Sequence, residues 1–135
     1  MEYIVNRYAE MILLENQKHN LVSRKNPALE VAKHIRDSIE AIKLVEFKNQ
    51  MAIDIGSGAG FPGMVLAIIK PDCNVTLLES DRKKSDFLQR VVEELELKNV
   101  QVINERAEVA GHDPKRREMY DLATCRAVAS AAILV

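Results

Sequence analysis

Four of the chain's five glycines lie between residues 56 and 63, directly after the short apolar run 51–55. A buried strand that ends in glycines and is followed by an apolar helical segment is typical of a strand–loop–helix unit in a parallel α/β sheet. Glycine lets the backbone turn sharply and lets a ligand contact the main chain. The sequence therefore predicts an α/β fold that holds a ligand at this loop.

Three further apolar runs alternate with helical patterns after the glycine cluster. Strand–helix–strand order is the pattern of a parallel α/β sheet. Asp81 is placed to cap the helix that follows the second strand. From Ala127 onward the pattern predicts another helix. The expected strands are 51–55, 75–78, 100–103 and 122–125.

The residues before the first strand are helical in pattern. We expect residues 1–48 to form an N-terminal helical part, and residues 49–135 to form the sheet-containing part. Pro27 is placed at the first position of a helix. On that helix, Leu29 belongs to the apolar stripe expected to face the core, whereas His34 belongs to the exposed face.

The composition excludes several classes of protein. A formal net charge of -1 over 135 residues excludes a generally basic nucleic-acid coat but leaves room for a local basic patch. No apolar run approaches the ~20 residues of a membrane span. Two cysteines without a C-x-x-C motif exclude a disulfide scaffold and a multi-cysteine zinc site. We therefore expect a cytoplasmic protein with no metal site and no membrane contact.

The glycine cluster fits two ligand patterns. Gly58-x-Gly60-x-x-Gly63 satisfies the G-x-G-x-x-G pattern of dinucleotide sites, which alone is a weak signal. Asp54-x-Gly56-x-Gly58-x-Gly60 satisfies the pattern used for S-adenosylmethionine, which adds an acidic residue before the first glycine. The first pattern leaves open a nicotinamide-dependent oxidoreductase.

The acidic residues favour the second ligand. A dinucleotide presents a pyrophosphate, which a carboxylate at Asp54 repels. S-adenosylmethionine presents an ammonium and a sulfonium, which the same carboxylate attracts. Glu79 ends the second expected strand, where a carboxylate can accept hydrogen bonds from both ribose hydroxyls. The combination indicates S-adenosylmethionine as the cofactor.

Seven short segments share the motifs of one known family. They are Asn-Leu-Val-Ser at 20–23, His-Ile-Arg-Asp-Ser at 34–38, Asp-Ile-Gly-Ser-Gly-Ala-Gly-Phe-Pro-Gly at 54–63, Leu-Glu-Ser at 78–80, Lys-Lys at 83–84, Arg-Ala-Glu at 106–108 and Arg-Ala-Val-Ala at 126–129. On these segments the chain resembles the bacterial small-subunit ribosomal RNA guanine-N7 methyltransferases, the glucose-inhibited division protein B family.

The resemblance implies a class I S-adenosylmethionine-dependent, Rossmann-like fold and methyl transfer to guanine N7 in 16S ribosomal RNA. N7 already carries an in-plane lone pair, so the transfer needs alignment rather than a general base. Arg126, aided by Arg106, is implied at the reaction centre. The implied cofactor-binding residues are Asp54, Gly56, Ser57, Gly58, Gly60, Phe61 and Glu79, with Ala107 and Glu108 near the adenine. The residues implied to contact RNA are Arg82, Lys83, Lys84 and His34.

The chain departs from the family pattern at both ends. The family has more helix before Met1, and it continues past Val135 with further strands. We therefore expect a truncated, partial sheet whose fourth strand is an open edge. An open edge favours self-association, whereas a longer form would be monomeric. A non-catalytic remnant that binds cofactor or RNA stays open as an alternative.

Overall fold

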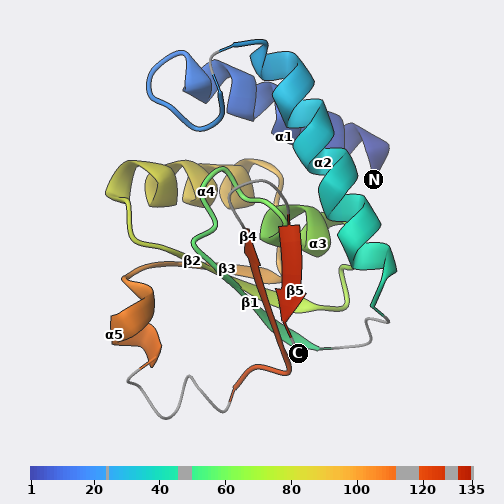
Figure 1. The fold of residues 1–135 in the computed structure, drawn as a ribbon, viewed down its shortest axis with the longest axis vertical. Helices are drawn as coiled ribbons and strands as arrows, with labels where there is room; N and C mark the ends of the chain where they lie inside the picture. The colour runs from blue at the N-terminus through green and yellow to red at the C-terminus, as the bar shows by residue number, and fades with distance from the viewer. Residues whose placement is uncertain (24, 46–49, 112–118, 127–130, 135) are drawn as a thin grey trace.

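The structure is a computed structural model that describes residues 1–23, 25–45, 50–111, 119–126 and 131–134 (Figure 1). The strands are β1 Met51–Ile55, β2 Asn74–Glu79, β3 Val100–Asn104, β4 Leu122–Arg126 and β5 Ala131–Leu134. They form one sheet in the order β3-β2-β1-β4-β5. β1 to β4 run parallel, and β5 runs antiparallel to β4. The four expected strands are confirmed to within one residue at each end.

The structure describes five helices, four of which contribute residues to one buried core. They are α1 Glu2–Asn16, α2 Pro27–Lys43, α3 Gly63–Ile69, α4 Arg82–Glu94 and α5 Ala107–Gly111. α3 and α4 pack against β2, and α1 packs on both of these helices (Figure 1). Tyr8 of α1 and Val31 of α2 belong to the same buried cluster as Met64 of α3 and Leu77 of β2. The division of the chain at residue 48 stays a prediction.

The sheet order decides where a ligand can bind. β1 leads to β2 and then β3 on one side, and the chain then returns to place β4 on the other side of β1. In open α/β sheets, ligands bind at the carboxyl ends of the strands where the strand order reverses. The glycine cluster follows β1 directly, so it lies at this switch point.

The helix expected from Ala127 onward is wrong for Ala131–Leu134, which form β5; residues 127–130 lie outside the described part of the chain. β4 pairs with β1 on one side, and its remaining N–H and C=O groups pair with β5, for example Thr124 with Ile133. Pairing of these backbone groups overrides the local helical pattern. The expectation of an open edge at β4 is therefore wrong. The prediction of self-association rested on that open edge, so the fold no longer gives a reason for it.

The face that α2 turns to the core also differs from the expectation. Leu29 is 70% exposed, whereas Val31, Ser38 and Ile42 are buried. The Ser38 hydroxyl donates a hydrogen bond of 2.7 Å to the His34 carbonyl oxygen, so this small polar side chain is satisfied inside the core. The buried stripe is rotated from the expected one, and it brings the His34 side chain inward.

Candidate functional site

The glycine loop, residues 56–63, leaves the carboxyl end of β1 with three residues in the left-handed region. The φ angles of Gly56, Gly58 and Gly60 are 69°, 58° and 113°. The N–H groups of Gly56 and Ser57 donate to the Leu78 carbonyl oxygen at 2.9 and 3.1 Å. Because a side chain would strain these conformations, glycine is needed for this turn against the end of β2.

The glycines of the loop serve two different purposes. A Cβ added at Gly56 would meet no heavy atom within 4 Å, and one at Gly58 would meet only the Gly56 carbonyl oxygen at 4.0 Å. A Cβ at Gly60 would lie 2.5 Å from the Tyr8 hydroxyl, and one at Gly63 would lie 2.5 Å from Cβ of Asp54. The first two glycines therefore leave space for a ligand to reach the backbone, and the last two allow close packing.

Glu79, the last residue of β2, holds the loop in place. Its Oε1 accepts the Gly58 N–H at 2.7 Å, and its Oε2 accepts the Asp81 N–H at 2.8 Å. An ionised carboxylate has about four acceptor positions, so each oxygen can accept a further bond. The side chain that is expected to bind the ribose hydroxyls thus also orients the glycine loop.

Asp54 lies beneath the loop and is fully buried in β1. Thr124, its partner across the β1–β4 pair, donates a hydroxyl hydrogen bond of 2.7 Å to Oδ1. Oδ2 is buried and accepts no hydrogen bond from the described residues. Burial raises the pKa of Asp54 to about 7, although the Thr124 hydroxyl opposes the shift. The carboxyl group therefore ties β1 to β4 just before the loop, and its direct contact with a ligand stays a prediction.

The end of β3 is tied to the end of β2. The Asn104 side-chain amide donates to the carbonyl oxygens of Glu79 and Ser80 at 2.9 and 3.0 Å. The backbone N–H of Glu105 donates to the Glu79 carbonyl oxygen at 3.1 Å. These bonds place Ala107 and Glu108, both exposed at the start of α5, just after this edge. This is where the sequence predicts the adenine contacts.

The predicted arginines lie at or just after the carboxyl ends of two parallel strands. Arg106 is exposed and comes two residues after β3. Arg126 is the last residue of β4, one place beyond Cys125, which pairs with Ile55 of β1. The carboxyl ends of parallel strands share one edge, so the backbone brings both residues to the edge that carries the glycine loop.

The residues predicted to contact RNA separate into two groups. Arg82, Lys83 and Lys84 open α4, which the Asp81 side chain caps by accepting the N–H groups of Lys83 and Lys84 at 2.9 and 3.3 Å. Arg82 and Lys83 are exposed. His34 instead belongs to α2.

His34 was expected to face solvent, but its side chain packs against the glycine loop. Its ring lies 5.2 Å from the Phe61 ring, between centroids, and its Nε2 is 3.2 Å from a Glu30 carboxylate oxygen. Phe61 is 1% exposed, and its ring also lies 5.8 Å from that of Tyr8. The Phe61 ring is thus part of the packing under the loop, and a cofactor contact through it stays a prediction.

Sequence analysis missed two side chains of the site. Neither Tyr8 nor Thr124 is among the residues that the sequence predicts for the site. A tyrosine within a buried stripe needs a partner for its hydroxyl, which is the one signal that points to Tyr8. The partners of both residues are distant in sequence, at 51 and 70 positions.

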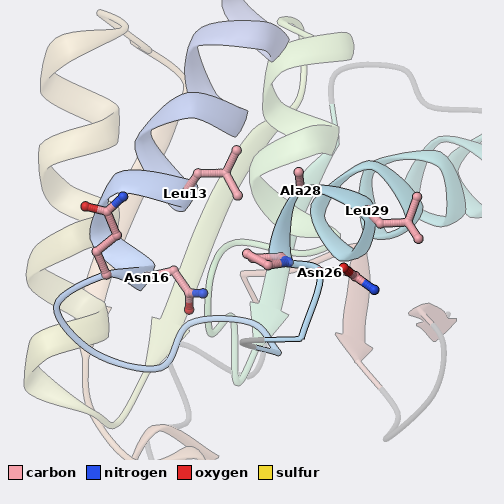
Figure 2. A pocket seen from close by; sticks show the side chains of 7 residues that line it. Leu13, Asn16, Asn26, Ala28 and Leu29 are labelled. Carbon is pink, nitrogen blue, oxygen red and sulfur yellow. The ribbon is translucent and has the colours of Figure 1, made fainter.

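A separate hollow lies between the end of α1 and the start of α2 (Figure 2). Its lining residues are Leu13, Asn16, Gln17, Asn26, Pro27, Ala28 and Leu29. None of them belongs to the glycine loop.

The described residues contain no group of three His, Cys, Asp or Glu side chains that could hold a metal ion. None of the described helices is long and apolar enough to span a membrane.

The sheet order and the loop at the end of β1 are those of a Rossmann-like fold, and its likeness to solved methyltransferases gives the class I S-adenosylmethionine-dependent methyltransferase fold. The chain is similar to the crystal structure of coclaurine N-methyltransferase bound to N-methylheliamine and SAH, with a TM-score of 0.61 and 18% identity, covering 78% of this chain and 30% of that chain. A protein-L-isoaspartate O-methyltransferase gives a TM-score of 0.51 and 22% identity over 71% of this chain and 29% of that chain. The predicted fold class is confirmed.

Sequence comparison gives the family. The chain belongs to the GidB family, described as rRNA small subunit methyltransferase G, whose family model matches residues 1–135. The ribosomal RNA small subunit methyltransferase G of Syntrophomonas wolfei is 47% identical over 100% of this chain and 63% of its own length. That of Fusobacterium nucleatum is 44% identical over 96% of this chain and 55% of its own length. The chain therefore spans little more than half of these relatives, and the family resemblance is confirmed.

Proposed function

We propose that this chain binds S-adenosylmethionine at the glycine loop and serves methyl transfer to guanine N7 in 16S ribosomal RNA. The observation that carries the proposal is the open side of the loop at Gly56 and Gly58, held beside the Glu79 carboxylate. Membership of the GidB family supports the reaction and the substrate.

The residues present fit this cofactor. The open backbone at Gly56 and Gly58 would accept the amino-acid end of the ligand, and the free acceptor positions of Glu79 would accept the ribose hydroxyls. Asp54, Ser57, Gly60 and Phe61 would shape the loop from below. Ala107 and Glu108 would lie near the adenine. When bound, the cofactor supplies a methyl group on a sulfonium centre.

The remaining side chains would handle the RNA. Arg126, aided by Arg106, would hold the guanine in line, since N7 needs alignment and no proton removal. Arg82, Lys83 and Lys84 are a source of phosphate contacts at the start of α4. Cations at a helix N-terminus are unfavourable toward the helix dipole, which favours a functional reason for them.

A nicotinamide dinucleotide is a poorer fit. Its pyrophosphate needs free N–H groups at the loop, but the Gly58 N–H already donates to the Glu79 carboxylate. A non-catalytic cofactor-binding or RNA-binding role remains the second candidate, and a methyl-transfer assay separates it from the first. We further propose a cytoplasmic location, where ribosomal RNA is found.

Two measurements test the proposal. Titration calorimetry should detect binding of S-adenosylhomocysteine and none of NAD. Incubation with labelled S-adenosylmethionine and small-subunit RNA should yield 7-methylguanosine in the 16S RNA, found by nuclease digestion and mass spectrometry. NAD binding without S-adenosylhomocysteine binding would refute the cofactor. Binding without any methyl transfer would favour the non-catalytic alternative.

Light scattering decides between the monomeric and self-associated states, which both stay predictions.

A further inference from the structure

Tyr8 of α1 reaches the middle of the glycine loop. Its side chain is fully buried, and its hydroxyl donates a hydrogen bond of 2.7 Å to the Ala59 carbonyl oxygen. Ala59 lies between the open glycine Gly58 and the packed glycine Gly60, and it is itself 0% exposed. The Tyr8 hydroxyl therefore satisfies a loop carbonyl that is shielded from water.

The same side chain fills the space above Gly60. A Cβ at Gly60 would lie 2.5 Å from the Tyr8 hydroxyl oxygen, so the absence of a side chain there makes room for Tyr8. The Tyr8 ring also packs beside that of Phe61, the next residue of the loop. Three consecutive loop residues thus contact or accommodate Tyr8.

The loop is held from two opposite directions. On the strand side, the carbonyl oxygen of Leu78 and the carboxylate of Glu79 bind the N–H groups of residues 56–58. On the helix side, Tyr8 binds the carbonyl oxygen of residue 59. A glycine-rich segment loses much conformational entropy on ordering, and a ligand that must order it binds more weakly. Restraints present before binding remove that cost.

We propose that Tyr8 is a positioning residue for the cofactor loop. Its hydroxyl fixes the peptide between Ala59 and Gly60, and thereby keeps Gly56 and Gly58 turned to the open side. The inference rests on the proposed S-adenosylmethionine binding and adds to it a role for the N-terminal helix α1. Because Tyr8 is fully buried, it would act through the loop rather than by contact with the cofactor.

The test compares two hydroxyl deletions. Tyr8→Phe removes the bond to Ala59 and keeps the ring. Tyr120→Phe is the matched control, because its hydroxyl donates to Oγ1 of Thr76 at 3.2 Å, a bond that does not involve the loop. Calorimetry at a temperature where both variants are folded should show affinity for S-adenosylhomocysteine about tenfold weaker in Tyr8→Phe, because binding must then order a loop that the Tyr8 bond no longer restrains. Tyr120→Phe should bind within about twofold of the unsubstituted chain, since its lost bond is remote from the loop.

Two further measurements separate positioning from general stability. Hydrogen exchange should become faster at the loop amides in Tyr8→Phe but not in Tyr120→Phe. p-Aminophenylalanine at position 8 keeps a donor and should restore the affinity; it also provides the comparison if Tyr8→Phe does not fold. Unchanged affinity in Tyr8→Phe, or equal losses in both Phe variants, would overturn the inference. Failure of the unsubstituted chain to bind would instead overturn the proposed function, and this inference with it.

Discussion

Adding one methyl group at Gly56 should mainly weaken ligand binding, whereas adding one at Gly60 should mainly weaken the fold, although the two glycines are only four residues apart in one loop. At Gly56 a Cβ would meet nothing within 4 Å, and only the φ of 69° opposes a side chain. A left-handed conformation costs an alanine about 1–2 kcal/mol. Gly56→Ala should therefore fold, with a small loss of stability, and place its methyl group in the space proposed for the ligand.

Gly60→Ala meets two obstacles. The new Cβ would lie 2.5 Å from the Tyr8 hydroxyl and 2.8 Å from Cβ of Met64, at a φ of 113°. Backbone strain of this kind costs about 1–3 kcal/mol, and overpacking a core costs about 1–3 kcal/mol more. A combined loss of about 2–6 kcal/mol is a large part of a domain's stability of about 5–15 kcal/mol.

Two assays on each variant separate these effects. Urea unfolding followed by circular dichroism gives the free energy of unfolding, and calorimetry gives the affinity for S-adenosylhomocysteine. Gly56→Ala should retain most of the stability and lose at least tenfold in affinity. Gly60→Ala should lose several kcal/mol of stability. Normal affinity in Gly56→Ala would show that the ligand does not use the open side of the loop, and equal stability of the two variants would contradict the packing argument.

Three other substitutions test the remaining parts of the site. Glu79→Gln places an amide where two backbone N–H groups need acceptors. The affinity for S-adenosylhomocysteine, measured by calorimetry, should therefore fall at least tenfold. An unchanged affinity would refute the role of Glu79. The pKa of Asp54 is raised to about 7 in the folded chain. The folded state therefore binds a proton at Asp54 more tightly than the unfolded state does. As a result, the free energy of unfolding should fall as the pH rises from about 4 to about 7. Asp54→Asn should flatten that pH profile, and a profile equal to that of the unsubstituted chain would exclude Asp54 as its source. Arg126→Ala should abolish methyl transfer to 16S RNA while leaving cofactor affinity nearly intact; loss of both together would assign Arg126 to the cofactor site or to the fold.

The strands were predictable because each is a short apolar run whose signal is local. β1 matches its expected bounds at both ends, and the Asp81 cap of α4 follows from a single residue and its two neighbours. β5 was not predictable in this way, because its local sequence pattern is helical. It forms a strand because its backbone groups pair with those of β4, which the local pattern does not show. The buried face of α2 was likewise set by its packing against α1, α3 and β5, which no periodicity within the helix reveals.

The parts of the candidate site that depend on residues close together in the sequence were predictable. Glycine spacing and an acidic residue at a strand end indicated the loop and Glu79. The sequence did not reveal that Asp54 is fully buried or that Thr124 binds it, since both depend on the register between β1 and β4. Polar side chains with distant partners are the part of a site that a single sequence conceals.

The spacing of the bonds around the loop determines when the site can be completed during synthesis. Tyr8 leaves the ribosome 51 residues before the carbonyl group that it binds, and Asp54 leaves it 70 residues before Thr124. Closing long loops is entropically costly, and contacts between distant residues form late in folding. A nascent chain that has exposed the whole glycine loop therefore lacks the bond from Thr124 to Asp54, in the strand that leads into the loop, until β4 has emerged. Affinity for the ligand should develop fully only after Thr124 has emerged and can bind Asp54.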